Sequence, residues 1–430
     1  MKKILTLAAF AAFSTFVVAQ SGTNSPYSQY GFGEQTDQAT GFNKGMNGLG
    51  LGYRKGDQVN VLNPASYSAM DSLTFIFDAG ASGQLTNFEE NEKRINAKNA
   101  NFEYVVAGFR AFKHLGVSFG IMPFSNVGYA YSNTQKVGDV NATTYTNTYK
   151  GTGGIHQVFL GFGWEIFKGF SLGVNGSYLW GDYERSLVNS YSDAYTNTLS
   201  KYYTASISDY KVDFGAQIAI PLSKKSDLTF GFTYGLGHKM NADPECKVIS
   251  TNSQTLVADT ASYVAKDGFG LPTVMSGGFM LNLNGRLRVG ADYQLQKWAK
   301  VGYPVYSMNG GKPTYQVTKD NFKDRHRITV GGDYCKDQSS RRFFDRIHFR
   351  AGASYATPYL KINGQDGPKE ISVSAGFGIP IINYWNNRSM LNISAQWVRM
   401  DASNYLKENT FRINIGLTFN EDWFMKWKVN

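Results

Sequence analysis

Alternation of apolar and polar residues, repeated in fourteen separate stretches, constrains this chain more than any other feature of its sequence. In the last stretch, Phe411, Ile413, Ile415, Leu417 and Phe419 are apolar, whereas the residues between them are Arg, Asn, Gly and Thr. A period of two places the apolar residues on one face of a β-strand and the polar residues on the other. The sequence therefore predicts an all-β protein built from strands of this kind.

The alternating stretches are roughly ten to fourteen residues long, enough for a tilted strand to cross a bilayer. After the first twenty residues, no run of about 18 apolar residues occurs, which excludes a membrane-spanning helix. The predicted strands are 73–86, 100–112, 114–124, 154–167, 169–182, 208–222, 226–240, 270–284, 286–299, 325–337, 345–356, 370–381, 388–399 and 408–419.

The connections between the predicted strands alternate in length. Short connections lie near 113–114, 168–169, 223–226 and 285. Long connections lie at 125–153, 183–207, 241–269 and 300–324. Transmembrane antiparallel β-barrels have an even number of strands, short periplasmic turns and longer outer loops. The sequence therefore predicts a barrel of about fourteen strands, with both chain termini in the periplasm.

The N-terminus has the features of an export signal. Two lysines follow Met1, an apolar stretch runs to Val18, and small residues precede a cleavage site after Ala19. This order defines a cleavable signal peptide at residues 1–19, and no cysteine follows it that could carry a lipid anchor. We expect an exported protein of the cell outer membrane.

Residues 20–72 lack a strand pattern and precede the first predicted strand. The polar strand faces carry mainly Gly, Ser, Thr and Asn, and such small side chains leave room inside the barrel. We predict an N-terminal hatch or plug at 20–72, the barrel at 73–419 and a periplasmic aromatic tail at 420–430. The alternative for 20–72 is a disordered periplasmic leader.

Neither the composition nor the motifs indicate catalysis. With 43 Lys and Arg against 33 Asp and Glu, the excess of positive charge is small and scattered, and we expect no nucleic-acid partner. No nucleophile–base set or metal-binding motif occurs, so we expect no enzyme, no metal and no cofactor. Cys246 and Cys335 fall at opposite ends of the predicted barrel, too far apart for a disulfide. The densest charge cluster, 324–327, is interpreted as a solvated rim and not as a site.

Two aromatic segments are candidate partner-docking sites. Trp423, Phe424 and Trp427 lie beyond the last predicted strand, where they form either an interfacial anchor or a tail that docks on a partner. Near the mature N-terminus, the sequence SPYSQYGFG contains two further candidates of this kind, Tyr27 and Tyr30, together with Pro26.

The sequence around Asn63-Pro64-Ala65 resembles the FadL family of outer-membrane transporters. In this chain the tripeptide is followed by a short spacer and the first strand, and residues 115–127 read LGVSFGIMPFSNV, which is similar to that family's third strand. The segment SPYSQYGFG is not the usual beginning of a FadL hatch and resembles exported barrel proteins of the Bacteroidetes.

The resemblance implies a fourteen-stranded barrel filled by a hatch, from which substrates leave sideways where the third strand kinks. Pro123 has no N–H for a ladder bond, which suits a kink or bulge, although it could also end the strand at the outer rim. The glycines before it would loosen the strand, and the Asn-Pro-Ala would sit near the gap. The candidate residues of the hatch and lateral gate are Asn63, Pro64, Ala65, Gly116, Gly120, Met122, Pro123 and Phe124.

Two functions follow from the resemblance. The first is passage of hydrophobic compounds, such as long-chain fatty acids, by lateral diffusion through the barrel wall. The alternative is a non-transporting accessory subunit of an outer-membrane protein assembly machine or of a type IX secretion machine, which the aromatic tail and the N-terminal motif favour. The expected partners are outer-membrane lipid, a hydrophobic small molecule and this machinery.

Overall fold

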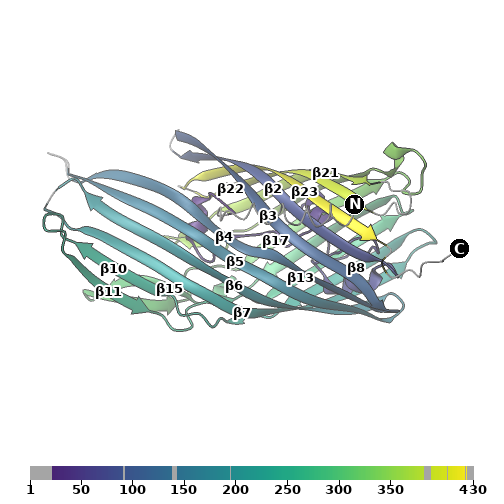
Figure 1. The fold of residues 1–430 in the computed structure, drawn as a ribbon, viewed down its shortest axis with the longest axis horizontal. Coiled ribbons are helices and arrows are strands. Elements are labelled where there is room, and N and C mark those ends of the chain that lie inside the picture. The colour runs from purple at the N-terminus through teal and green to yellow at the C-terminus, as the bar shows by residue number, and fades with distance from the viewer. Residues whose placement is uncertain are drawn as a thin grey trace, which may run out of the picture.

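Fourteen antiparallel strands close into one barrel in the computed structural model (Figure 1). The structure describes residues 22–90, 93–137, 143–193, 195–381, 389–403, 405–421 and 423. The barrel strands are β2 (Phe75–Glu90), β3 (Lys93–Phe112), β4 (Leu115–Val137), β5 (Thr143–Phe167), β6 (Phe170–Tyr191), β7 (Thr198–Pro221), β8 (Asp227–Gly235), β13 (Val274–Leu283), β14 (Leu287–Gln296), β17 (Arg325–Cys335), β18 (His348–Ala356), β21 (Lys369–Pro380), β22 (Met390–Asp401) and β23 (Lys407–Glu421). Pairing of β2 with β23 closes the ring. The predicted all-β barrel is confirmed, and each predicted strand overlaps one of these fourteen.

The outer surface of the barrel is apolar and its inner surface is polar. On β23, the outward side chains of Phe411, Ile413 and Ile415 are exposed, whereas Asn414 and Thr418 are buried inside. A water-soluble protein shows the opposite arrangement, so the alternation along each strand produces a wall that faces lipid. No helix in the described residues is long and apolar enough to cross a membrane.

The two ends of the barrel differ, as the lengths of the connections predicted. At one end, called the turn end here, the described turns are 113–114, 168–169, 222–226, 284–286 and 336–347. The last of these is longer than the others and holds η4 (Phe343–Arg346). The opposite, loop end carries the long connections, which contain β9 (His238–Lys239), β10 (Glu245–Thr251), β11 (Ala258–Val264), β12 (Gly270–Leu271), η3 (Trp298–Lys300), β15 (Tyr303–Asn309), β16 (Lys312–Thr318), β19 (Lys361–Ile362) and β20 (Gln365–Asp366).

At the loop end, β4 to β7 extend well beyond the other strands (Figure 1). Much of the predicted loops 125–153 and 183–207 is therefore strand. Apart from 127–132, which the sequence suggested as a ragged continuation of the third strand, these extensions were missed because they are rich in Tyr, Thr, Asn and Ser and lack the continuous apolar face that lipid requires. β10 and β11 continue this sheet beside β7.

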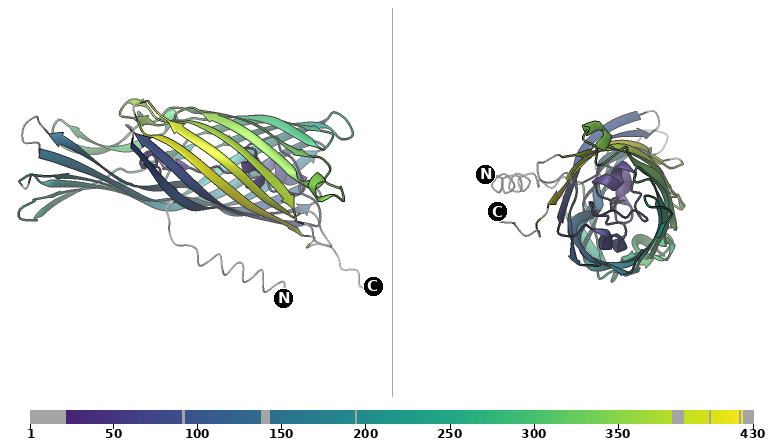
Figure 2. Two further views of the ribbon diagram at one scale, coloured as in Figure 1. Left: turned by 90° about the horizontal axis from the view of Figure 1, so that it is seen from above. Right: turned by 90° about the vertical axis from the view of Figure 1, so that its right-hand side faces the viewer.

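Residues 22–74 fill the lumen and are called the plug here (Figure 2, right). They form η1 (Pro26–Gln29), β1 (Glu34–Gln35), α2 (Gly41–Gly45) and η2 (Pro64–Ala69), and they are largely buried. Glycines on the wall let the plug backbone approach closely: a Cβ on Gly231 would lie 1.9 Å from the carbonyl oxygen of Leu51. This packing agrees with a plug and not with a disordered leader.

Candidate functional site

A gap opens in the barrel wall between β3 and β4. The two strands pair only as far as Val105 and Ile121, and beyond this point residues 93–104 of β3 pair with β2 alone. Pro123 follows directly, and the register of β4 against β5 shifts between Pro123 and Ser125. Because Pro123 has no N–H to donate, a bulge forms there. The strand continues past Pro123 to residue 137, so Pro123 does not end it.

The plug covers the β4 side of this gap. β1 forms an antiparallel pair with β4, with Glu34 opposite Asn126 and Gln35 opposite Ser125. The Thr36 hydroxyl then donates to the carbonyl oxygen of Pro123 at 2.6 Å. The strand edge that Pro123 leaves unpaired is thus bonded to the chain's own N-terminal region.

The same segment reaches the β3 side. The Asn101 side chain donates to the carbonyl oxygen of Gly22 at 2.6 Å, and the Asn24 side chain donates to that of Lys98 at 3.2 Å. A Cβ on Gly22 would lie 2.6 Å from the Asn126 side chain of β4. Residues 22–38 therefore bridge the two edges and seal the gap. Both termini were expected at the turn end, but the first described residue lies here, midway along β3 and β4.

A cavity of about 260 Å³ lies behind the sealed gap. Phe102, Pro123 and Phe124 from the gap form part of its lining, and Leu51 and Pro64 of the plug form another part. The remaining lining combines charged residues with apolar ones such as Leu271, Trp298 and Met400. Its ionisable residues are Glu34, Asp37, Glu103, Lys211, Asp213, Asp292, Arg325, Arg327, Glu370 and Arg412. A cavity with this mixed lining offers both apolar contacts and buried charges to whatever occupies it.

Ion pairs in the cavity join the plug to the wall. The Arg327 guanidinium of β17 lies 2.7 Å from the Asp37 carboxylate of the plug, and Arg412 of β23 lies 3.6 Å from the Glu34 carboxylate of the plug. Burial of Asp37 would raise the pKa of its carboxyl, but the charge of Arg327 outweighs this effect and holds the pKa well below its usual range.

The interpretation of 324–327 as a solvated rim was wrong. Alternate residues of β17 face opposite sides of the wall, so Arg325 and Arg327 point into the lumen while His326 is exposed. The charge cluster in the sequence is thus divided between the two faces of the strand.

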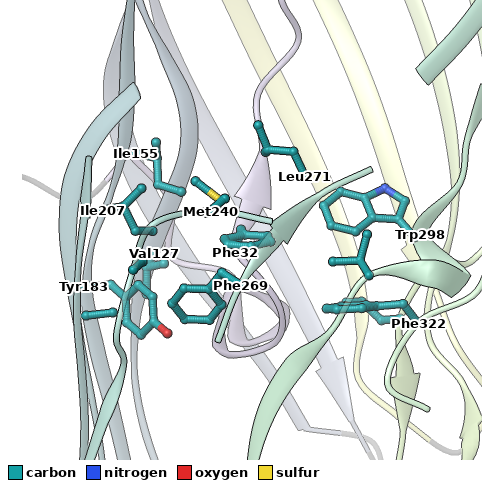
Figure 3. Packing of buried hydrophobic residues seen from close by; sticks show 14 of the residues in the cluster. Phe32, Val127, Ile155, Tyr183, Ile207, Met240, Phe269, Leu271, Trp298 and Phe322 are labelled. Carbon is teal, nitrogen blue, oxygen red and sulfur yellow. The ribbon is translucent and has the colours of Figure 1, made fainter. Parts of the chain in front are cut away.

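A cluster of buried hydrophobic side chains, many of them aromatic, packs at the loop end beside the cavity (Figure 3). It packs Phe32 of the plug against wall residues and against side chains from the long connections, and this set is called the cap here. The cap includes Phe32, Val127, Ile155, Tyr183, Ile207, Met240, Phe269, Leu271, Trp298 and Phe322. Phe32 and Trp298 have ring centroids 6.0 Å apart, and both are almost completely buried.

The N-terminal docking candidates belong to this interior. Tyr27 is 7% exposed, and its hydroxyl donates to the carbonyl oxygen of Leu406, while Tyr30 packs against the cap. Pro26 begins η1 beside them. Tyr27 is therefore part of the core at the loop end, while docking through the half-buried Pro26 and Tyr30 stays a prediction.

In the C-terminal tail, Trp423 stacks on Phe75 of the wall, with ring centroids 4.6 Å apart and an angle of 9° between the rings. This contact matches the interfacial anchor. Phe424 and Trp427 lie outside the described residues.

The Asn-Pro-Ala tripeptide is located away from the β3 edge. The Asn63 side chain caps η2 by accepting from the N–H of Ala65 at 3.1 Å, and it donates to the carbonyl oxygen of Ala216 on β7 at 3.1 Å. Pro64 packs on Gly173 of β6. The tripeptide thus fixes the plug to the wall at β6 and β7.

Among the other gate candidates, Gly116 and Met122 contact the plug, whereas Gly120 packs on β3. A Cβ on Gly116 would lie 1.9 Å from the carbonyl oxygen of Tyr67, so this glycine makes room for the plug. Gly120 lies beside the Val105 carbonyl of β3, where a Cβ would be 2.5 Å from the oxygen. Met122 is buried in a cluster with Tyr67 and Val59. Of all the predicted gate residues, Pro64, Pro123 and Phe124 line the cavity.

Sequence reasoning missed the gap-sealing role of residues 22–38 and their partners Asn101 and Asn126. The pairing of β1 with β4 uses backbone atoms, which leave no pattern in the side chains. The inward direction of Arg325 and Arg327 could have been predicted, because side chains alternate between the two faces of a strand and the odd-numbered residues of β17 face the lumen.

The two cysteines, Cys246 on β10 and Cys335 at the end of β17, are free and buried, as predicted. Within the described residues, no group of His, Cys, Asp or Glu side chains is arranged to hold a metal ion.

The fold is that of the FadL-like outer-membrane channels. The Pseudomonas putida toluene transporter TodX matches 90% of this chain over 100% of its own, with a TM-score of 0.60 and 13% identity. A Pseudomonas aeruginosa FadL homologue has a TM-score of 0.59 at 11% identity, and the match covers 91% of this chain and 99% of the homologue. The Ralstonia pickettii toluene transporter TbuX has a TM-score of 0.57 at 13% identity, and the match covers 89% of this chain and 98% of the transporter. At these identities the likeness establishes the fold alone.

The chain belongs to the BamG family, whose model matches residues 1–430. A search of curated protein sequences found no significant match. The resemblance of the N-terminal motif to proteins of the Bacteroidetes stays a prediction.

Proposed function

We propose that this protein is a non-transporting accessory subunit of an outer-membrane protein assembly machine. Membership of the BamG family supports this role. The same membership favours assembly over type IX secretion. No reaction is catalysed and no cofactor is required in this role.

The sealed gap is the observation that carries the proposal. In a transporter of the FadL type, cargo would leave where β3 and β4 separate, but here residues 22–38 bond to both strand edges. Leaving this position would expose backbone groups of β4 at the level of the membrane, where water cannot satisfy them.

The closed interior supports the same conclusion. The cap buries its aromatic side chains at the loop end, and in the cavity beneath it the ion pairs Asp37–Arg327 and Glu34–Arg412 join plug and wall. An apolar molecule crossing this lumen would have to disrupt the cap and lie against desolvated charges, and both steps are unfavourable. A closed barrel of this kind is suited to act through its outer surfaces.

Passage of hydrophobic compounds, such as long-chain fatty acids, is the second candidate. It is favoured by Phe102, Pro123 and Phe124, which bring the cavity to the gap. Solved channels of the same fold are named as toluene transporters and as a monoaromatic hydrocarbon channel. Transport would require residues 22–38 to leave the gap.

Purification and depletion separate the two candidates. The tagged full-length protein is extracted from membranes with mild detergent, and its partners and bound lipids are quantified by mass spectrometry. An assembly subunit is expected to carry a stoichiometric amount of the central barrel-assembly component, and its depletion should lower the amounts of several unrelated outer-membrane barrels. A lone barrel with fatty acid bound, whose depletion affects only uptake of apolar compounds, would overturn the proposal.

A further inference from the structure

The turn end of the barrel carries far more positive than negative charge. Its described turns hold nine basic and two acidic residues. The basic residues are Lys113, Lys168, Lys224, Lys225, Arg286, Lys336, Arg341, Arg342 and Arg346, and the acidic ones are Asp337 and Asp345. These residues, with the apolar side chains beside them, are called the turn-end rim here.

The loop end provides the comparison. Its described connections, 192–193, 195–197, 236–273, 297–324, 357–368, 402–403 and 405–406, hold nine basic and eight acidic residues. Charges there are close to balanced, and some form pairs, such as Lys323 with Asp366 at 2.9 Å. The basic excess is therefore a property of one end and not of exposed connections in general.

The basic side chains of the rim are free to bind a ligand. All of them are exposed except Arg346, which is half-buried. Among the described residues, only Lys336 of this set forms an ion pair, with Asp345 at 2.9 Å. Unpaired, exposed cations concentrated at one end produce a positive surface potential that attracts anions.

Each turn also places an exposed apolar side chain beside its basic residues. Phe112 precedes Lys113, Phe167 precedes Lys168, and Phe344 follows Arg342. Exposed leucines lie near the basic residues of the other two turns, Leu222 two residues before Lys224 and Leu283 three residues before Arg286. A large apolar side chain adjacent to a Lys or Arg is the arrangement found at a membrane–water interface, where the apolar group enters the lipid and the cation reaches the headgroups.

The distribution of these turns around the barrel identifies the ligand. They join β3 to β4, β5 to β6, β7 to β8, β13 to β14 and β17 to β18, so they follow most of the circumference (Figure 2, right). A protein partner would contact one side, whereas a lipid leaflet surrounds the barrel completely. We propose that the turn-end rim binds the phosphate headgroups of anionic phospholipids in the leaflet at that end of the barrel.

The test measures which lipids the full-length protein retains. The protein is reconstituted into nanodiscs of mixed phosphatidylglycerol and phosphatidylcholine, and the bound lipids are counted by native mass spectrometry. The rim variant carries Lys113→Gln, Lys168→Gln, Lys224→Gln and Lys225→Gln. The control variant carries four substitutions of exposed residues at the loop end: Lys247→Gln, Lys300→Gln, Lys312→Gln and Lys319→Gln.

Wild type and control variant are expected to retain phosphatidylglycerol preferentially, and the rim variant to lose this preference on the order of tenfold. Lys→Arg at the same four positions should restore it, and high salt should abolish it in the wild type. No preference in the wild type, or an equal loss in the rim and control variants, would overturn the proposal. If the rim variant fails to fold, the wild-type protein alone tests the proposal: a preference for phosphatidylglycerol that disappears in high salt supports it, and no such preference overturns it. This test does not depend on the assembly role.

Discussion

The Asp37 carboxylate of the plug and the Arg327 guanidinium of β17 lie 2.7 Å apart, and the pair anchors the gap-sealing segment to the opposite wall. β17 is half-way round the barrel from β4. Residues 34–38 thus bond to β4 on one side and to β17 on the other, and they form a strap across the lumen. The gap is closed by a segment that is fixed at both ends.

Breaking this pair is expected to loosen the strap. Arg327→Gln leaves the Asp37 carboxylate without its cation, which should lower the free energy of unfolding by about 1.5–3 kcal/mol. Urea titration of the protein in detergent measures the change. Arg286→Gln, in an exposed turn, serves as the control and should have almost no effect. Equal effects of the two substitutions would show that the pair contributes nothing to stability.

The same pair predicts a dependence of stability on pH. The pKa of Asp37 is depressed in the folded protein, so its contribution is present above the ordinary Asp pKa of about 3.9 and is lost as the pH falls below that value. Lys44 and Arg412 act on this carboxyl in the same direction as Arg327.

Between about pH 5 and pH 3, the wild type should therefore lose more stability than Asp37→Asn, which has no proton to take up at this position. Thermal unfolding measured across this range tests the difference. If the stability of the two proteins fell in parallel with pH, Asp37 would not be the source of the pH dependence.

Because plug and wall are in close contact, adding one methyl group between them is expected to destabilise the protein. In Gly231→Ala, the new Cβ would meet the Leu51 carbonyl, and the plug must shift at a cost of about 1–3 kcal/mol. Gly83→Ala on β2 is the matched control, because its Cβ would have no neighbour within 4 Å. Limited proteolysis should cleave the plug faster only in Gly231→Ala, and similar rates in both variants would argue against this packing.

Truncation of the cap at Phe32 should destabilise the barrel at its loop end. Phe32→Ala removes a buried ring that contacts Trp298 and Phe269, with an expected loss of about 3–5 kcal/mol. Phe344→Ala removes a ring that is 80% exposed and should change stability little in detergent. The variants are compared by urea titration. A loss below about 1 kcal/mol in Phe32→Ala would show that the cap is not a packed core.

The sequence was sufficient to predict the barrel because lipid imposes a repeated pattern on every strand that crosses it. Strand segments outside the lipid, such as 127–137 of β4, have no such requirement and were only partly anticipated. Pro123 could be identified as the site of a kink or bulge because it lacks an N–H. The strap at 34–38 could not, because its pairing to β4 depends on backbone groups that every residue possesses.

The burial of Tyr27, which was predicted as a docking residue, could not be anticipated for a related reason. An aromatic motif has the same composition on a surface and in a core, and only the fold distinguishes the two. The location of the plug glycines opposite wall glycines likewise requires the three-dimensional register.

Locking the strap to β4 tests the central claim most directly. In a background with Cys246→Ser and Cys335→Ser, the substitutions Gln35→Cys and Ser125→Cys place two thiols at paired positions. The oxidised, locked protein is expected to support outer-membrane protein assembly as well as the reduced protein does. The contrary result would be a protein whose function is lost when the gap is locked by oxidation and returns on reduction. That result is expected if the gap must open for transport.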